Sequence, residues 1–196
     1  MAFYDQEAQQ RATRPLAPHR LQMREAFAAQ LIFEGRQRLI EIGTGPGLDA
    51  AAFLARGLQV SGVNLSVEHV RLCRQGGINA QQASVHQLPY ADDAFDAGWT
   101  MSTLLHVPDI EFDLTVLEIR RVLRAGSPLA IRLWGGSDSE GVRHDDEIHP
   151  PRFFSFRSDS RLQQLLSLRG TVERFETWTP DGPGRGTYQW VVLRTA

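Results

Sequence analysis

A glycine-rich loop is the first feature of this sequence that could do chemistry. Gly43, Gly45 and Gly47 are spaced as Gly-x-Gly-x-Gly, and Glu41 lies two residues before the first of them. Glycine has no Cβ, so this loop can turn tightly and bring its backbone close to a ligand. A loop that holds a pyrophosphate has the longer spacing Gly-x-Gly-x-x-Gly, and a buried acid would repel that anion. The pattern therefore favours a ligand that carries positive charge.

Histidines supply the other candidate chemistry. His106 follows the fourth predicted strand and is a candidate general base, because imidazole exchanges a proton near neutral pH. The alternative is that it holds its loop through a hydrogen bond. The residues from His144 to His149 form a cluster of histidines and acids. Imidazole and carboxylate groups bind divalent ions, but such clusters on polar loops are usually solvated, so we predict no metal site.

The composition argues against several classes of function. All 21 residues counted as lysine or arginine are arginines, so no lysine is available for a Schiff base or a phosphate-binding loop. Cys73 is the only cysteine, which excludes an intramolecular disulfide. The net charge of -2 and the lack of a basic stripe argue against a nucleic-acid partner. Because no apolar run reaches about 18 residues and the first residues are unlike a signal peptide, we expect a cytoplasmic protein without a membrane partner.

Alternating strand-like and helix-like segments must position these residues. Such alternation indicates βαβ units and a parallel sheet. The last two strands follow one another without a helix, which indicates an antiparallel element. We expect strands at 38–42, 59–63, 79–83, 95–101, 128–134, 171–179 and 187–194, and a polar loop at 135–151. We expect helices at 7–31, with an interruption near Pro15 and Pro18, and at 49–56, 109–123 and 159–168. Ser66 is a candidate N-cap for a further helix that ends at Gly76 and Gly77. Within the helix at 109–123, the apolar positions Ile110, Leu114, Leu117 and Val122 lie near helical spacing.

Five segments of this chain, in this order, resemble the class I S-adenosylmethionine-dependent methyltransferases. They are residues 41–47, 60–66, 88–96, 105–109 and 120–127. The resemblance implies an α/β, Rossmann-like three-layer sandwich with a mostly parallel seven-stranded sheet and an antiparallel last strand. It implies one domain over 1–196, with an N-terminal helical lid (1–35), a cofactor-binding core (36–134) and the C-terminal part of the sheet (135–196).

The resemblance also assigns a cofactor site for S-adenosylmethionine, which would leave as S-adenosylhomocysteine. Glu41 would lie near the amino-acid end of the cofactor, Asn64 at the ribose hydroxyls and Leu65 against the adenine ring. Ser84 and Val85 would face the adenine edge. The full set of expected cofactor-binding residues is Glu41, Gly43, Thr44, Gly45, Gly47, Asn64, Leu65, Ser84, Val85 and Thr100.

Two of these positions depart from the family pattern. The ribose position is usually an acid, and the adenine-edge position is commonly aspartate, but here they are Asn64 and Ser84. A carboxylate accepts charge-assisted hydrogen bonds that are roughly twice as strong as neutral ones. Asn64 therefore predicts a loss on the order of 1–2 kcal/mol in cofactor binding.

The resemblance implies a methyltransferase that acts on a small-molecule acceptor, as a monomer or a homodimer. Tyr4, Trp134, His144 and Phe153 are candidate acceptor-binding residues. Trp134 and Phe153 could form the wall of an aromatic or apolar acceptor pocket, or they could belong to the core. Tyr4 could close over the cofactor as part of a lid, or it could lie on a frayed N-terminal helix. Three alternatives stay open. The domain could use the cofactor as a charged scaffold for another reaction such as a cyclisation, or it could be a non-catalytic binding protein. A nicotinamide dehydrogenase is disfavoured by the glycine spacing and the missing ribose acid.

Overall fold

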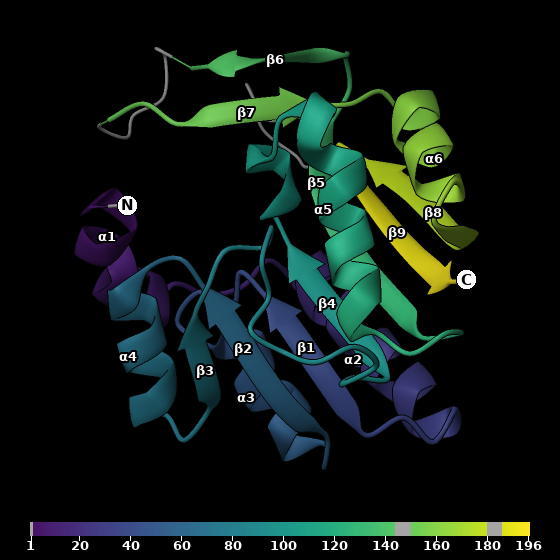
Figure 1. Ribbon diagram of the computed structural model, residues 1–196. Coiled ribbons are helices and arrows are strands. Elements are labelled where there is room, and N and C mark those ends of the chain that lie inside the picture. Colours follow the sequence, from purple (N-terminus) through teal and green to yellow (C-terminus); the bar gives the residue numbers. More distant parts are fainter. Residues whose placement is uncertain (1, 144–149, 180–185) are drawn as a thin grey trace.

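A seven-stranded sheet forms the centre of the computed structural model, which describes residues 2–143, 150–179 and 186–196 (Figure 1). The strand order is β3-β2-β1-β4-β5-β9-β8. β9 is antiparallel to both of its neighbours, β5 and β8, and the other strand pairs in this sheet are parallel. This confirms the predicted fold class. The strands are β1 (Arg38–Ile42), β2 (Gln59–Asn64), β3 (Asn79–Gln82), β4 (Ala97–Met101), β5 (Pro128–Gly135), β8 (Gly170–Trp178) and β9 (Thr187–Thr195).

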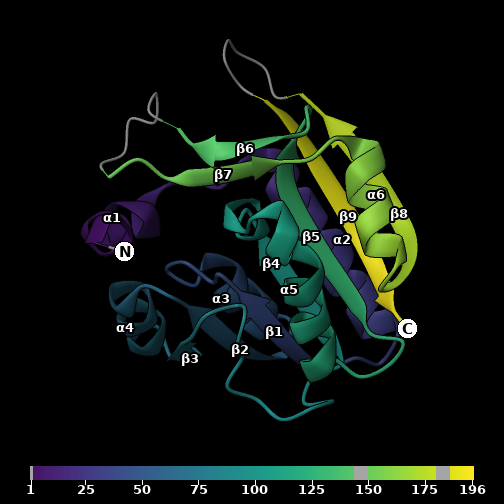
Figure 2. The ribbon, with the colours of Figure 1, turned by 45° about the horizontal axis from the view of Figure 1, so that its top comes forward.

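Helices cover both faces of this sheet. One face packs against α2 (Pro18–Phe33), α3 (Leu48–Ala55) and α4 (Val67–Gln75). The other packs against α5 (Asp109–Val122) and α6 (Asp159–Ser167). The first helix, α1 (Ala2–Thr13), lies against α4 (Figure 2). Among the described helices, none is both long and apolar enough to cross a bilayer.

The central strands are buried on both faces, which is why they are short apolar runs. On β1, Leu39 faces the core below α2 and α3, whereas Ile40 and Ile42 face the core below α5. Every residue of β4 is buried. Such double burial is typical of parallel strands inside an α/β sheet. Because these strands are parallel, their carboxyl ends lie at one common edge of the sheet. The loops of the candidate site begin at this edge.

The buried face of α5 differs from the predicted one. Ile110, Leu114 and Leu117 are exposed, with 86%, 65% and 41% of their surface accessible. The face that packs on the sheet instead carries Phe112, Thr115, Val116, Ile119 and Val122. Both apolar stripes have helical spacing, and the stripe that contains Phe112 is the one that packs into the core beneath the helix.

The segment 135–151 is not wholly a loop, as the sequence had suggested. Residues Ser139–Val142 form β6, which pairs with β7 (Phe153–Phe156) in an antiparallel two-stranded sheet. The hairpin lies above the ends at which β4 and β5 terminate (Figure 1, Figure 2). Its polar strand gives no alternating apolar pattern, because β6 is largely exposed and is held by its pairing with the apolar β7.

Candidate functional site

The glycine loop between β1 and α3 has a backbone that requires glycine. Gly43, Gly45 and Gly47 have φ angles of +74°, +55° and +89°, in the left-handed region. A Cβ on Gly43 would lie 1.9 Å from the Oγ1 of Thr103, and a Cβ on Gly47 would lie 2.4 Å from Ile78. The loop is therefore pressed against the end of β4 on one side and against β3 on the other.

Glu41 lies beneath this loop with only 2% of its surface exposed. The hydroxyl of Thr44 donates a hydrogen bond of 2.9 Å to the Glu41 carboxylate. Burial and then the nearby charge of Asp49 raise the pKa of Glu41 to about 8. Glu41 thus holds a proton at neutral pH in the free protein, and a cation bound nearby would favour its ionised form.

Asp49 forms a second buried acid in the first turn of α3, and its partners come from α2 and β4. The side chain is fully buried. Arg20 donates to it at 2.9 and 2.6 Å, and Arg24 donates at 3.4 Å. The indole of Trp99 donates at 3.0 Å. This network connects α2 to the start of α3, directly after the glycine loop. It could not be predicted from the sequence, because α2 and α3 are far apart in the chain.

Cys73 also contacts the glycine loop. Its thiol donates to the carbonyl oxygen of Gly45 at 3.3 Å. Burial raises the pKa of this thiol to about 11, so the reactive thiolate is disfavoured. Cys73 therefore packs the loop against α4.

The N-terminal helix α1 reaches the predicted ribose side of the site. The Asp5 carboxylate accepts a hydrogen bond from the Ser66 hydroxyl and another, of 3.2 Å, from the Glu68 amide. Ser66 is also the N-cap of α4. The backbone of Tyr4 belongs to α1, whereas its side chain lies outside the described part of the structure. Its contact with an acceptor, and the lid role of the segment 1–35, stay predictions.

The predicted adenosine-binding residues gather at the ends of β2 and β3. The Oδ1 atom of Asn64 accepts a hydrogen bond of 2.9 Å from the Ser66 amide. Leu65 is 49% exposed, so it offers an apolar surface to a ring. The Ser84 hydroxyl accepts from the His86 amide at 3.2 Å, and Val85 is buried in the core cluster beneath.

Thr100 differs from the other predicted cofactor ligands. Its side chain is fully buried in β4, and its hydroxyl has no hydrogen-bond partner among the described residues. Its contact with a cofactor stays a prediction that this burial does not favour. The open end of β4 is formed instead by Ser102, with a φ of +56°, and Thr103, whose hydroxyl donates to the Ile42 carbonyl at 3.3 Å.

His106 ends the short helix η1 (Leu104–His106), which follows Thr103. Its Nδ1 lies 2.7 Å from the carbonyl oxygen of Phe153. A carbonyl oxygen only accepts, so Nδ1 carries the proton and the lone pair of the neutral ring is on Nε2. The His106 ring lies 4.9 Å from that of Phe154, between centroids. The hairpin thereby orients the candidate base, and the predicted acceptor residue Phe153 contributes its backbone.

Two further contacts fix the hairpin to α5. The Glu140 carboxylate of β6 accepts a hydrogen bond of 2.8 Å from the Asp109 amide, at the start of α5. Arg157, just after β7, donates to the Asp109 carboxylate at 2.8 Å. Asp109 also accepts from Arg161 at 2.8 Å, and these two guanidinium groups lower its pKa against the effect of its burial.

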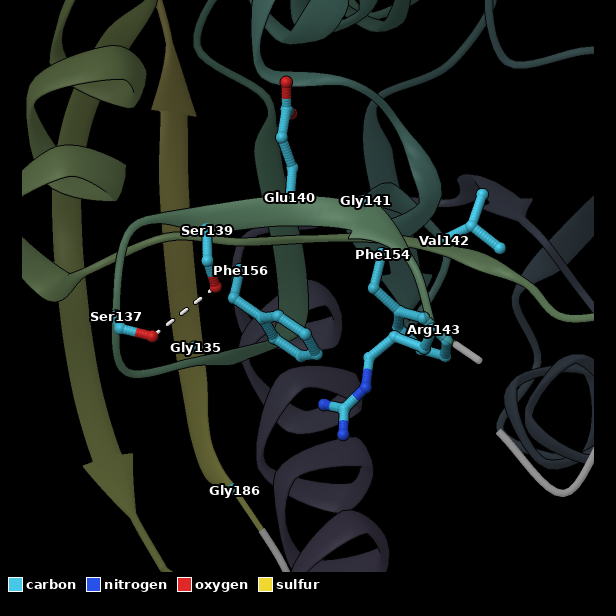
Figure 3. Close-up of a pocket in the computed structure, with 10 residues that line it drawn as sticks. All are labelled: Gly135, Ser137, Ser139, Glu140, Gly141, Val142, Arg143, Phe154, Phe156 and Gly186. Atoms are coloured by element: carbon cyan, nitrogen blue, oxygen red, sulfur yellow. Dashed lines mark hydrogen bonds between the residues drawn. The ribbon is translucent and has the colours of Figure 1, made fainter. Parts of the chain in front are cut away.

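A cleft of about 660 Å³ lies between this hairpin and the ends of β5 and β9 (Figure 3). Phe154 and Phe156 stack with centroids 5.6 Å apart and point into it. The guanidinium of Arg143 lies 5.7 Å from the centre of the Phe156 ring. Glu140 points to the opposite side of the hairpin, toward α5. The cleft therefore has an aromatic wall, and Phe154 joins it to His106.

Aromatic side chains continue from this cleft across the end of the sheet. The predicted acceptor residue Trp134 lies 6.2 Å from Phe154 and 5.8 Å from Tyr188, between ring centroids. Tyr188 stacks on Trp178, which stacks on His19 at the start of α2. The contact between His19 and Trp178 was not predicted from the sequence, because it depends on the pairing of β8 with β9 and on the position of α2.

The structure therefore brings most of the predicted site residues to one edge of the sheet. The exceptions are Thr100, which is enclosed in the core, Tyr4, whose side chain is not described, and His144, which lies outside the described residues together with the rest of the His144–His149 cluster. Among the described residues, no group of three or more histidines, cysteines or acids has the arrangement of a metal site.

Known proteins with similar sequences are methyltransferases. Residues 40–131 match a family model described as a methyltransferase domain. The chain is 34% identical over 127 residues to methyltransferase GfsG of Streptomyces halstedii, covering 60% of this chain and 45% of that protein. It is 33% identical over 104 residues to O-methyltransferase rstn1 of Aspergillus nomiae, covering 48% of this chain and 45% of that protein. The chain thus spans less than half the length of these relatives.

Solved structures share the fold. The 1,6-didemethyltoxoflavin-N1-methyltransferase of Burkholderia thailandensis, which holds 1,6-didemethyltoxoflavin and S-adenosylhomocysteine, has a TM-score of 0.68 and 20% identity, covering 93% of this chain and 92% of that chain. The cyclase SpnF has a TM-score of 0.69 and 20% identity, covering 89% of this chain and 80% of that chain. At this identity the likeness concerns the fold alone.

Proposed function

We propose that this chain, of which residues 40–131 match a methyltransferase domain, transfers the methyl group of S-adenosylmethionine to a hydroxyl group of a small-molecule acceptor. The observation that carries the proposal is the glycine loop, in which Gly43 closes on Thr103 above the buried Glu41. The choice of a hydroxyl acceptor is supported by the O-methyltransferase among the relatives.

The residues at the strand ends fit the cofactor in chemistry. The buried Glu41 suits the ammonium group of the methionine part, because a cation compensates its negative charge. Leu65 offers half of its surface to the adenine ring. Asn64 keeps one lone pair of its Oδ1 and its amide protons for the ribose hydroxyls, since the Ser66 amide uses only one lone pair.

The protein's task in this reaction is alignment. When bound, S-adenosylmethionine supplies a methyl group that is already activated by its sulfonium. Holding an acceptor oxygen in line with it can contribute roughly 7–11 kcal/mol to lowering the barrier. No protein nucleophile is needed, but a hydroxyl acceptor must lose a proton. We assign that proton to the Nε2 of His106, whose tautomer is set by the Phe153 carbonyl.

We assign the acceptor to the cleft under the β6–β7 hairpin. Its volume of about 660 Å³ falls in the range of roughly 300–1,000 Å³ of small-molecule sites. A chain of contacts joins it to the glycine loop. Gly43 lies against Thr103, η1 carries His106, and His106 contacts Phe154 in the cleft wall. This chain of contacts would connect an acceptor in the cleft to the candidate base through Phe154, and to the cofactor loop through η1 and Thr103.

The test is turnover by the purified protein. S-adenosylmethionine is incubated with a panel of phenols and aliphatic alcohols, and S-adenosylhomocysteine and the methylated product are measured by mass spectrometry. Equal amounts of the two products are the expected result. A converted acceptor without S-adenosylhomocysteine would favour the use of the cofactor as a scaffold. Failure to bind either form of the cofactor would favour a non-catalytic protein.

A further inference from the structure

Arg132 of β5 is a buried cation that the proposed reaction does not yet use. Only 9% of its surface is exposed. Its Nη2 donates to the Ser102 hydroxyl at 3.0 Å, and its guanidinium lies 4.7 Å from the centre of the Tyr188 ring. Its Nε is buried without a hydrogen-bond partner in the described part of the chain. Arg132 forms no ion pair with any acid of that part.

Arg157 is a second buried arginine, and its guanidinium has both a counter-charge and hydrogen-bond acceptors. It is 2% exposed, and its guanidinium lies 4.0 Å from the Phe112 ring. It donates to the Asp109 carboxylate at 2.8 Å and to two backbone carbonyls at 3.0 and 3.4 Å. Both arginines contact an aromatic face, but only Arg157 has an acid. Burying a charge without a counter-charge costs free energy. Arg132 therefore requires a counter-charge, which Arg157 already has.

The charges around Arg132 do not meet that requirement. Burial, and then the positive charge of Arg20, lower the pKa of Arg132 to about 10, so it stays protonated at neutral pH. Asp49 acts on it favourably at a distance, but Asp49 already accepts from Arg20 and Arg24. Arg24 is also paired with Glu25, whereas no ion pair joins Arg132 to a carboxylate of the described residues.

The place of Arg132 in the sheet assigns this charge to the acceptor side. Arg132 pairs with Met101 of β4, while the glycine loop leaves β1, on the other side of β4, after Ile42. Neighbouring strands lie about 4.8 Å apart, so β5 is roughly 10 Å from the strand that begins the cofactor loop. The adjoining Trp134 is a candidate acceptor residue, and its indole nitrogen is buried without a partner among the described residues.

We propose that Arg132 is a specificity-determining residue, and that the acceptor is a planar molecule with a carboxylate-type anionic oxygen that Arg132 binds. This inference rests on the proposed function, because it names the substrate class of the same site. Trp134 contacts Phe154 of the cleft wall, and Tyr188 contacts Trp134, so the ring of such an acceptor would extend from the cleft along these aromatic faces toward Arg132. A guanidinium presents its N–H groups in a planar fork that matches a carboxylate. The anion would supply the counter-charge that this part of the fold lacks.

The probes are aromatic carboxylates, each paired with its primary amide: benzoate, 4-hydroxybenzoate and indole-3-carboxylate. They are titrated calorimetrically into the protein loaded with S-adenosylhomocysteine. We expect at least one carboxylate to bind 10- to 100-fold more tightly than its amide, the order of a charge-assisted pair. Arg132→Gln should abolish this preference, and Arg132→Lys should keep part of it because the charge remains. The exposed Arg174→Gln is the matched control and should keep all of it.

Each other outcome overturns the inference. It is wrong if no carboxylate is preferred over its amide, or if the preference survives Arg132→Gln. Both Arg132→Gln and Arg132→Lys could bind S-adenosylhomocysteine more weakly while the wild type shows no preference for a carboxylate. That result would assign the anion to the cofactor's own carboxylate and contradict the acceptor assignment. If Arg132→Gln does not fold, an undiminished preference in Arg132→Lys contradicts the proposed fork geometry. Titration of the wild type with S-adenosylhomocysteine alone tests the proposed function separately.

Discussion

The guanidinium of Arg20 donates two hydrogen bonds to one carboxylate oxygen of Asp49, from Nε at 2.9 Å and from Nη2 at 2.6 Å. Asp49 lies in the first turn of α3, directly after the glycine loop, and its side chain is fully buried. Arg20 belongs to α2. This pair therefore links the N-terminal helices to the loop that is proposed to hold the cofactor.

Removal of this link is expected to affect both stability and cofactor affinity. Arg20→Gln leaves Asp49 buried with Arg24 and Trp99 as its remaining partners, so we expect the free energy of unfolding to fall by roughly 2–3 kcal/mol. The affinity for S-adenosylhomocysteine should fall as well. Urea denaturation and calorimetry measure the two effects. Arg56→Gln breaks a surface pair with Glu25 and should cost less than about 1 kcal/mol. Equal losses in both variants would contradict the role of Arg20.

Two glycines of the loop form a matched pair for a second prediction. Gly43→Ala adds a Cβ that would lie 1.9 Å from Thr103, whereas Gly45→Ala meets nothing within 4 Å. Both residues have positive φ. We expect Gly45→Ala to destabilise the protein by about 1–2 kcal/mol, from backbone strain alone. Gly43→Ala should cost about 3 kcal/mol or more, since steric overlap adds to that strain. Thermal unfolding decides it, and equal effects would show that the contact with Thr103 is readily relieved.

Glu41 predicts a pH dependence of stability. Burial raises its pKa from 4.5 to about 8, so between these values the native state binds more protons than the unfolded state. The stabilising contribution of the raised pKa is fully present below 4.5 and is lost as the pH rises through about 8. The stability of the wild type relative to Glu41→Gln should therefore fall as the pH rises. Melting temperatures of both proteins across this window measure it, and a constant difference would contradict the raised pKa.

His106 gives a prediction for the chemical step. With an acceptor identified by turnover, His106→Gln should lower kcat by about 10²-fold or more, the usual contribution of a general base. The affinity for S-adenosylhomocysteine should stay unchanged, because the Nδ1 of His106 bonds to the Phe153 carbonyl of the hairpin. His86→Gln, at a partly exposed histidine near α5, is the control. An unchanged kcat would leave His106 as a residue that only orders the hairpin.

The sequence was informative where local chemistry determines structure. The strand at 38–42, the three glycines and the Ser66 N-cap all follow from residue type and spacing, and the structure confirms them. The face of α5 could not be predicted. Ile110, Leu114 and Leu117 have the same i, i+4, i+7 spacing as Phe112, Val116 and Ile119, and only packing on the sheet separates the two stripes.

The missed parts of the site depend on contacts between distant segments. Asp49 and Arg20 are separated by 29 positions. Nothing in the sequence indicates which of the many arginines pairs with this aspartate. Ser102, directly after β4, has a left-handed backbone. This could not be predicted from residue type, because serine does not favour that conformation. The polar β6 is held by its pairing with β7 and by the hydrogen bond that the Asp109 amide of α5 donates to the Glu140 carboxylate.

Asn64 predicts a gain of affinity from a single substitution. Asn64→Asp keeps one oxygen for the Ser66 amide and offers a second, charged oxygen to the ribose hydroxyls. We expect S-adenosylhomocysteine to bind roughly 5- to 30-fold more tightly, which corresponds to about 1–2 kcal/mol. Asn79→Asp, at an exposed asparagine of β3, is the control. Unchanged or weaker binding by Asn64→Asp would move the ribose away from this position.

Calorimetric titration of the wild-type protein with S-adenosylmethionine and S-adenosylhomocysteine tests the central claim most directly. The account predicts one site for each, with a Kd in the micromolar range, or about -8 kcal/mol. It also predicts weaker binding by Gly43→Ala, whose added Cβ would meet Thr103. No heat of binding from either ligand at millimolar concentration would contradict the assignment, and the chain would then have the methyltransferase fold without the cofactor site.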